Sequence, residues 1–166
     1  MLRAFDIAAS GTWDRSRRRS LVSLDFDHRC RRRIALEAAD GTSFLLDLPQ
    51  PRHLRDGDGI VLENSSVVEV KAAPEPLLEI RCAGMDQLVR LAWHLGNRHV
   101  PTELRPDCLR IRSDHVLADM AVRLGAQVIP IEAAFDPESG AYAKVALSPS
   151  HHDHGHHGHQ HEDHHS

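Results

Sequence analysis

The sequence predicts an α+β protein: a small β-rich domain, barrel-like or sandwich-like, precedes a ferredoxin-like βαββαβ domain and a disordered His-rich tail. Short alternating apolar runs predict the first domain in residues 1–73, and helical spacings between further strands predict the second in residues 74–148. Residues 149–166 follow, and from His151 onward they contain no aliphatic or aromatic side chain. Without this tail about 150 of the 166 residues remain, enough for one sizeable core or two modest ones.

The N-terminal domain is expected to consist of short strands separated by turns. Gly, Pro, Asp and Asn cluster between the apolar runs, and no helical period of useful length occurs. Closely spaced short strands are typical of a small barrel or sandwich. We expect strands over residues 21–26, 34–36, 43–48, 59–62 and 67–70.

The C-terminal domain follows a change in composition at Pro74 and Pro76. Two prolines in three residues favour an extended connection, and we assign the domain boundary there. The elements after it follow the βαββαβ order of ferredoxin-like domains. We expect a strand over 77–82, a helix over 85–95 that ends at Gly96, a hairpin of 102–105 and 108–112, a second helix, and a strand over 127–132.

Both helices are expected to cover the sheet with one apolar face each. On the first helix, the spacing assigns Val89 and Trp93 to that inward face. The second helix begins with Ser113 or Asp114 as its N-terminal cap and is followed by Gly125, a residue that favours helix ends.

The tail carries the strongest chemical signal of the chain, because nine of the fourteen histidines lie in its last sixteen residues. Neutral imidazole suits Zn(II), Cu(II) and Ni(II), and a chain without fixed geometry is expected to bind Cu(II) more tightly than Ni(II). Gly, Asp, Glu and Gln interrupt the run, which favours a natural segment over an uninterrupted expression tag. The nine candidate metal ligands are His151, His152, His154, His156, His157, His159, His161, His164 and His165.

Of the five other histidines, all in the region expected to fold, two are further candidate metal ligands. His99 directly follows the first helix, and His115 lies at the start of the second. We expect these two helix ends at opposite ends of the domain, so the two imidazoles would share an ion only through a loop or a neighbouring chain. The spacing by itself favours a surface or capping role for each.

Charge and motifs exclude several function classes. The formal net charge is −4, and nucleic-acid binding needs a basic face, so we expect no nucleic-acid partner. The arginine clusters at residues 15–19 and 29–33 are interpreted as a solvated face or a docking site for an acidic protein surface. The chain has no P-loop, GxGxxG, HExxH or GxSxG motif, so we expect no enzymatic activity.

The cysteines and the hydropathy pattern indicate a reducing, cytoplasmic setting. The three cysteines are an odd number and form no CxxC pair, which argues against a disulfide framework or a cysteine zinc site. No apolar stretch has the roughly 20 residues needed to cross a membrane, and the first ten residues do not resemble a secretory signal. We therefore expect no membrane partner.

Two motifs and the tail together resemble one known family. Residues 93–101, Trp-His-Leu-Gly-Asn-Arg-His-Val-Pro, precede residues 114–120, Asp-His-Val-Leu-Ala-Asp-Met, and the His-rich end follows. This order resembles the urease accessory protein UreE family of nickel metallochaperones over essentially the whole chain.

The resemblance implies a homodimer formed by the ferredoxin-like domains, with His99 from both subunits binding Ni(II) at the interface and the tail histidines adding ligands. It also implies that the N-terminal domain binds peptides or partners. The expected partners are the other urease accessory proteins, including the GTPase, and the urease apoprotein complex. Some relatives have a second histidine where this chain has Ser113, so His115 is implied only as an auxiliary ligand.

Two other functions remain open at this point. The chain could be a histidine-rich nickel or zinc storage or detoxification protein, with the tail as its active part and the domains as a scaffold. The arginine clusters leave open an RNA-binding or protein-folding adaptor, which would require salt-dependent RNA binding. His99→Ala separates a chaperone from a store, because only the chaperone would lose urease activation.

Overall fold

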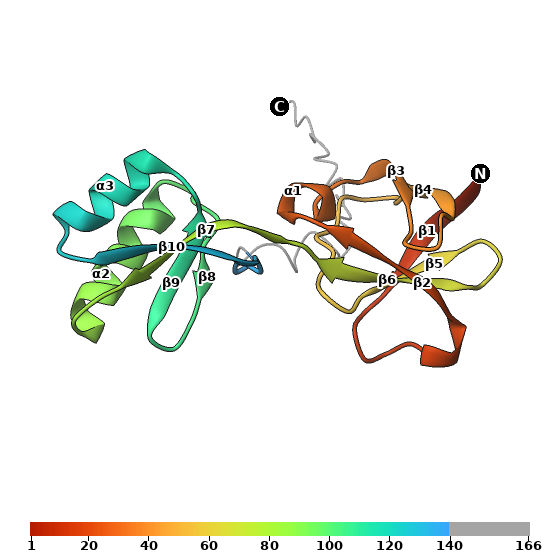
Figure 1. Ribbon diagram of the computed structural model, residues 1–166, viewed down its shortest axis with the longest axis horizontal. Helices are drawn as coiled ribbons and strands as arrows, with labels where there is room; N and C mark the ends of the chain where they lie inside the picture. The colour runs from red at the N-terminus through yellow and green to blue at the C-terminus, as the bar shows by residue number, and fades with distance from the viewer. Residues whose placement is uncertain (140–166) are drawn as a thin grey trace, which may run out of the picture.

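The computed structural model describes residues 1–139. Two lobes, each built on its own β-sheet, are joined by an extended ribbon (Figure 1). The N-terminal lobe comprises strands β1 to β6, and the C-terminal lobe comprises β7 to β10 with helices α2 and α3. The chain is therefore an α+β protein, as predicted. The expected tail, and residues 140–148 of the expected second domain, lie outside the described residues.

The N-terminal lobe is a curled six-stranded sheet with the order β2-β6-β5-β1-β4-β3. The pairs β1–β4 and β2–β6 are parallel and the other pairs are antiparallel. The backbone N–H of Ala39, after β3, donates to the carbonyl of Leu21 in β2 at 2.8 Å, which links the two ends of the sheet. The elements are β1 (Leu2–Ala8), η1 (Arg15–Arg17), β2 (Arg18–Leu24), α1 (Phe26–Arg29), β3 (Arg33–Glu37), β4 (Ser43–Asp47), β5 (Gly59–Leu62) and β6 (Val67–Ala72).

Alternating side chains fill the core of this lobe, as the sequence pattern predicts for Phe44 and Leu46 of β4. Strand β1 was not predicted, because a bulge between Ala4 and Asp6 breaks the period-two pattern. The expected strand over 21–26 is wrong at its end: Phe26 begins α1 instead. Asp25 ends the strand by capping this short helix, since its Oδ1 accepts a hydrogen bond from the His28 N–H at 2.9 Å.

The C-terminal lobe has the predicted βαββαβ order. Its sheet order is β10-β7-β9-β8, with every neighbouring pair antiparallel. Both helices pack on the same face of this sheet, where they bury a core that includes Leu78, Ile80, Leu91, Leu95 and Ile111. The elements are β7 (Pro74–Arg81), α2 (Met85–Asn97), β8 (Glu103–Leu104), β9 (Cys108–Arg112), α3 (His115–Arg123) and β10 (Gln127–Ala134). No helix in residues 1–139 is long and apolar enough to cross a membrane.

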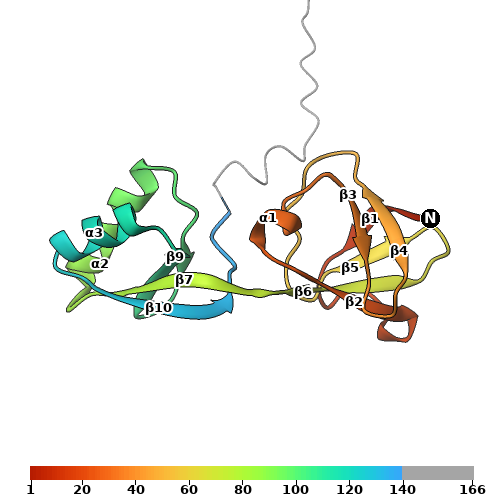
Figure 2. The ribbon, with the colours of Figure 1, turned by 45° about the horizontal axis from the view of Figure 1, so that its top comes forward.

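The connection between the lobes is shorter than predicted. Strand β7 begins at Pro74 rather than at residue 77, so only Ala73 separates it from β6. The prolines are tolerated because they occupy the start of the strand, before β9 joins it at Leu77. Figure 2 shows β6 and β7 as one nearly continuous ribbon, with the segment after β10 lying between the two lobes.

Candidate functional site

His99 occupies a specialised position at the end of α2. Arg98 is the C-cap, and His99 follows it with φ = 54°, in the left-handed region. The His99 N–H donates to the Gly96 carbonyl at 2.9 Å and the Val100 N–H donates to the Leu95 carbonyl at 3.2 Å. These two bonds form a Schellman motif, in which the position of His99 is usually glycine. Gly96, expected to end the helix, lies inside it.

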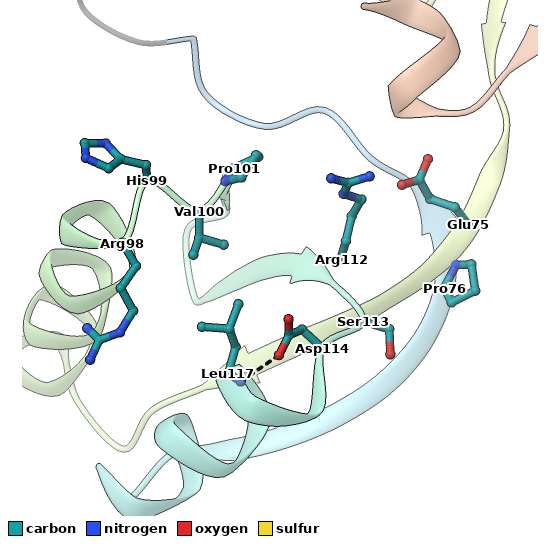
Figure 3. Close-up of a pocket in the computed structure, with 10 residues that line it drawn as sticks. All are labelled: Glu75, Pro76, Arg98, His99, Val100, Pro101, Arg112, Ser113, Asp114 and Leu117. Atoms are coloured by element: carbon teal, nitrogen blue, oxygen red, sulfur yellow. Dashed lines mark hydrogen bonds between the residues drawn. The ribbon is translucent and has the colours of Figure 1, made fainter.

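This helix end borders a hollow of ≈ 600 Å³ that also takes in the start of α3, the start of β7 and the end of β9 (Figure 3). His99 is exposed, and its ring points away from the other lining side chains. The lining residues are Glu75, Pro76, Arg98, His99, Val100, Pro101, Arg112, Ser113, Asp114 and Leu117.

Most charged side chains of this hollow already have partners. Glu75 accepts a hydrogen bond from the Phe26 N–H at 2.8 Å, and Arg112 forms an ion pair of 2.9 Å with Asp27, so both are engaged with α1. Asp114 caps α3, where its Oδ1 accepts from the N–H groups of Val116 and Leu117 at 2.8 and 3.0 Å. Within residues 1–139 the His99 imidazole has no hydrogen-bond partner, and it is therefore available to a ligand.

His115 is exposed in the first turn of α3 and borders a second hollow of ≈ 460 Å³. His94 and Arg98 of α2 line the same hollow. The expectation that the end of α2 and the start of α3 lie at opposite ends of the domain is therefore wrong. Because β7 and β9 are antiparallel, the helices that follow them run in opposite directions. The end of one helix is thus brought beside the start of the other.

The described part of the chain holds no complete metal site. In residues 1–139 no three His, Cys, Asp or Glu side chains lie close enough together to hold one ion. The nine tail histidines lie outside these residues. Burial raises the pKa of the thiols of Cys30, Cys82 and Cys108, which disfavours the thiolate form that metals bind.

An apolar stripe on α2 is left uncovered. Met85, Val89 and Trp93 are 63%, 60% and 62% exposed and follow one another at intervals of four residues. The expectation that Val89 and Trp93 face the core is wrong, because Leu88, Leu91 and Leu95 fill that role. Helix α2 thus carries two apolar faces, of which the sheet covers one.

Family comparisons agree with the motifs around His99. Residues 5–73 match the model of the UreE urease accessory protein N-terminal domain, and residues 75–166 match that of its C-terminal domain. The chain belongs to the UreE urease accessory protein family. Such proteins support urease maturation, and the family name denotes an accessory protein rather than a catalyst.

Relatives that align over most of this chain carry the same name. A urease accessory protein UreE of Bradyrhizobium sp. strain BTAi1 is 51% identical over 93% of this chain and 74% of its own length. The Rhodopseudomonas palustris strain HaA2 protein of that name is 52% identical over 91% of this chain and 70% of its own length. A third, from Chelativorans sp. strain BNC1, is 46% identical over 99% of both chains.

Proposed function

We propose that this chain is a nickel metallochaperone that delivers Ni(II) for assembly of the urease active site. The observation that carries the proposal is the exposed imidazole of His99, which has no hydrogen-bond partner among the described residues 1–139 and is held at the end of the helix whose apolar stripe is uncovered. Family membership supports the urease context and a metal-related role. The metal is cargo here, so the site must both bind it and release it.

The proposal requires a homodimer built on the C-terminal lobe. A single imidazole is a weak site, but a two-fold axis beside His99 would supply the same ligand twice. Uncovered apolar patches mark protein interaction sites, and the stripe of Met85, Val89 and Trp93 lies on the same helix. We propose that this stripe is buried between two subunits.

Two imidazoles from two subunits would leave coordination positions open. We propose that the nine tail histidines occupy these positions in turn, with His115 as an auxiliary ligand. Imidazole also suits Zn(II) and Cu(II), so the same ligands should accept those ions, and the preference for Ni(II) rests on the family. Open positions suit transfer, because an acceptor can add its own ligands before the donor's are lost.

The proposed partners are proteins: other urease accessory proteins, including the GTPase, and the urease apoprotein complex. We propose residues 1–73 as the partner-binding domain, 74–148 as the metal-binding and dimerisation domain, and 149–166 as the metal-binding tail. Arg15 and Arg18 both pair with the buried Glu69, at 2.8 and 3.1 Å, so part of their positive charge is already offset within the lobe. This supports a protein partner over nucleic acid, which needs a free basic face. Free cysteines suit the reducing cytoplasm, the proposed location.

The test compares His99→Ala with a matched control, His94→Ala, in the full chain and in a chain that ends at Ser150. Isothermal titration with Ni(II) and urease activation in cells are measured for each. We expect His99→Ala to abolish activation and to remove the site that survives truncation, while His94→Ala keeps both. Unimpaired urease activation in His99→Ala would overturn the chaperone proposal in favour of a storage or detoxification protein.

A further inference from the structure

After β10 the chain turns back to the N-terminal lobe. We name residues 135–139 the strap. Phe135 is fully buried, and its ring packs edge-on against Phe26 of α1 with a centroid distance of 5.3 Å. Arg55 donates to Asp136 at 2.8 Å and to the Ser139 hydroxyl at 3.0 Å. The strap is thereby fixed to the N-terminal lobe.

The strap is also fixed to the C-terminal lobe, close to the candidate site. The Asp136 N–H donates to the buried Glu103 carboxylate at 3.2 Å, and the Glu138 N–H donates to the Thr102 carbonyl at 2.9 Å. Thr102 lies three residues after His99. The strap therefore ties both lobes together beside the segment that carries His99.

A buried cation lies under the strap. Arg29 is fully buried, and in residues 1–139 no carboxylate lies within ion-pair distance of it. Its guanidinium donates to the carbonyls of Phe135 and Leu54, and its Nη1 lies 3.3 Å from Nε2 of His53. Its Nε has no hydrogen-bond partner in the part of the chain that the structure describes. An uncompensated buried charge is costly, so the Phe135 carbonyl, which is the strap's own acceptor for Arg29, favours the closed strap.

The His53 ring must be neutral for this arrangement, because a protonated Nε2 has no lone pair for Arg29. Positive charge faces it from Arg29 of α1 and from Arg55, and negative charge from Asp136 of the strap and from Asp58. The ring also lies against Phe26, with a centroid distance of 5.1 Å. Burial, followed by the charges of Arg29 and Arg55, holds the pKa of His53 below its usual value.

We propose that His53 is a pH sensor for the strap: its protonation places a second positive charge beside buried Arg29 and opens the strap, so that residues 135–139 leave both lobes together. With the strap open, His53 regains water and an ordinary pKa near 6.5. The open form therefore binds a proton more readily than the closed form. Closure is strongest above about pH 6.5 and weakens as the pH falls below it. This inference does not depend on the metal chemistry proposed above.

The first experiment is an NMR titration of the His53 ring in the full chain, kept metal-free by a chelator. We expect an apparent pKa below 6.5 in the wild-type protein and a return toward 6.5 in Phe135→Ala, which lacks the strap's buried anchor. Strap closure and protonation of His53 are thermodynamically linked: closure lowers the proton affinity of His53 by the same factor by which protonation lowers the closure equilibrium constant. The same His53 titration in both proteins would overturn the proposal.

The second experiment does not depend on the folding of Phe135→Ala. Amide exchange of Asp136 and Glu138 is compared at about pH 7.5 and about pH 5.5, corrected for intrinsic rates, a window in which ordinary carboxylates stay ionised. Because pH 5.5 lies one unit below the ordinary histidine pKa of about 6.5, protection should fall several-fold between the two pH values and approach a limit of about tenfold for the largest shifts in the pKa of His53. His53→Gln keeps an acceptor and does not titrate, so its protection should be the same at both pH values. His28→Gln, an exposed control, should lose protection at the lower pH as the wild type does. An equal loss of protection in His53→Gln would overturn the proposal.

Discussion

The two lobes differ in how many of their own apolar side chains they cover and how many of their polar side chains they pair. The N-terminal lobe covers its apolar side chains and pairs many of its arginines, and only Met1 and Phe5 are large, apolar and exposed there. The C-terminal lobe leaves six such side chains uncovered: Met85, Val89, Trp93, Leu104, Val116 and Val122. It also presents His99 without a partner within residues 1–139. The lobe with unsatisfied groups is the one in which a second chain and a metal ion would find their contacts.

The largest expected effect tests the self-sufficiency of the N-terminal lobe. Phe44→Ala removes a fully buried ring from its core and should lower the free energy of unfolding by about 3–5 kcal/mol. Phe5→Ala, which removes a half-exposed ring from the same sheet, should cost far less. Urea denaturation monitored by circular dichroism measures both. Equal losses would mean that Phe5 is covered in solution and that the contrast between the lobes is smaller than described.

The next effect tests whether the exposed apolar stripe of the C-terminal lobe is covered by a second chain. Trp93→Asp introduces a charge into the exposed stripe and should weaken self-association by about 2 kcal/mol or more, since tryptophan commonly anchors interfaces. Its control is Phe5→Asp, the same change at an exposed N-terminal site. Sedimentation of both variants over a range of concentrations measures the dimer constant. Unchanged association of Trp93→Asp would show that the stripe is not an interface.

A smaller effect is expected at the start of α3. Asp114→Ala removes the carboxylate that accepts two backbone N–H groups and should cost about 1 kcal/mol of stability. Asp119→Ala, on the exposed surface of the same helix, is the control. Thermal unfolding distinguishes them. If both variants unfold alike, Asp114 does not hold this edge of the hollow in solution.

The smallest effect has the opposite sign. His99→Gly places glycine where the left-handed backbone favours it and should stabilise the chain by up to about 1 kcal/mol, even though it removes the proposed metal ligand. His99→Ala, which keeps the strain, should not stabilise it. Denaturant titrations of metal-free protein compare the two. A loss of stability in His99→Gly would mean that the imidazole makes contacts that favour folding.

The sequence predicted the order of elements in the C-terminal lobe because its caps and turns are local signals. Asp114 and Gly125 bound α3 as expected, and Gly125 adopts a positive φ of 85°. The sequence alone could not show which apolar face of α2 meets the sheet, because Val89 and Trp93 are four residues apart, as Leu91 and Leu95 are. That choice is made by tertiary packing.

The strap was missed for a related reason. Residues 135–149 carry no periodicity, so the sequence favoured a loop there, yet Phe135 is fully buried between the lobes. Phe135 is the only aromatic residue among residues 135–139, and it is the only local sign of such a contact. The expectation that Arg29 belongs to a solvated or docking face is wrong, because this side chain is fully buried. Its burial depends on Phe135, which lies 106 residues away along the chain, so no local signal reveals it. His53 had no assigned role. The candidate site at His99 was reached through the family motif rather than through spacing.

The direct passage from β6 to β7 has a consequence for how this family can vary. Because only Ala73 separates the strands, one added or deleted residue would reverse which side of the ribbon each later side chain occupies. The second sheet would then present its helices on the opposite side of the molecule. Selection should therefore reject insertions or deletions of one residue at this point and tolerate those of two residues. This constraint comes from the alternation of side chains along the backbone and not from the identity of any side chain.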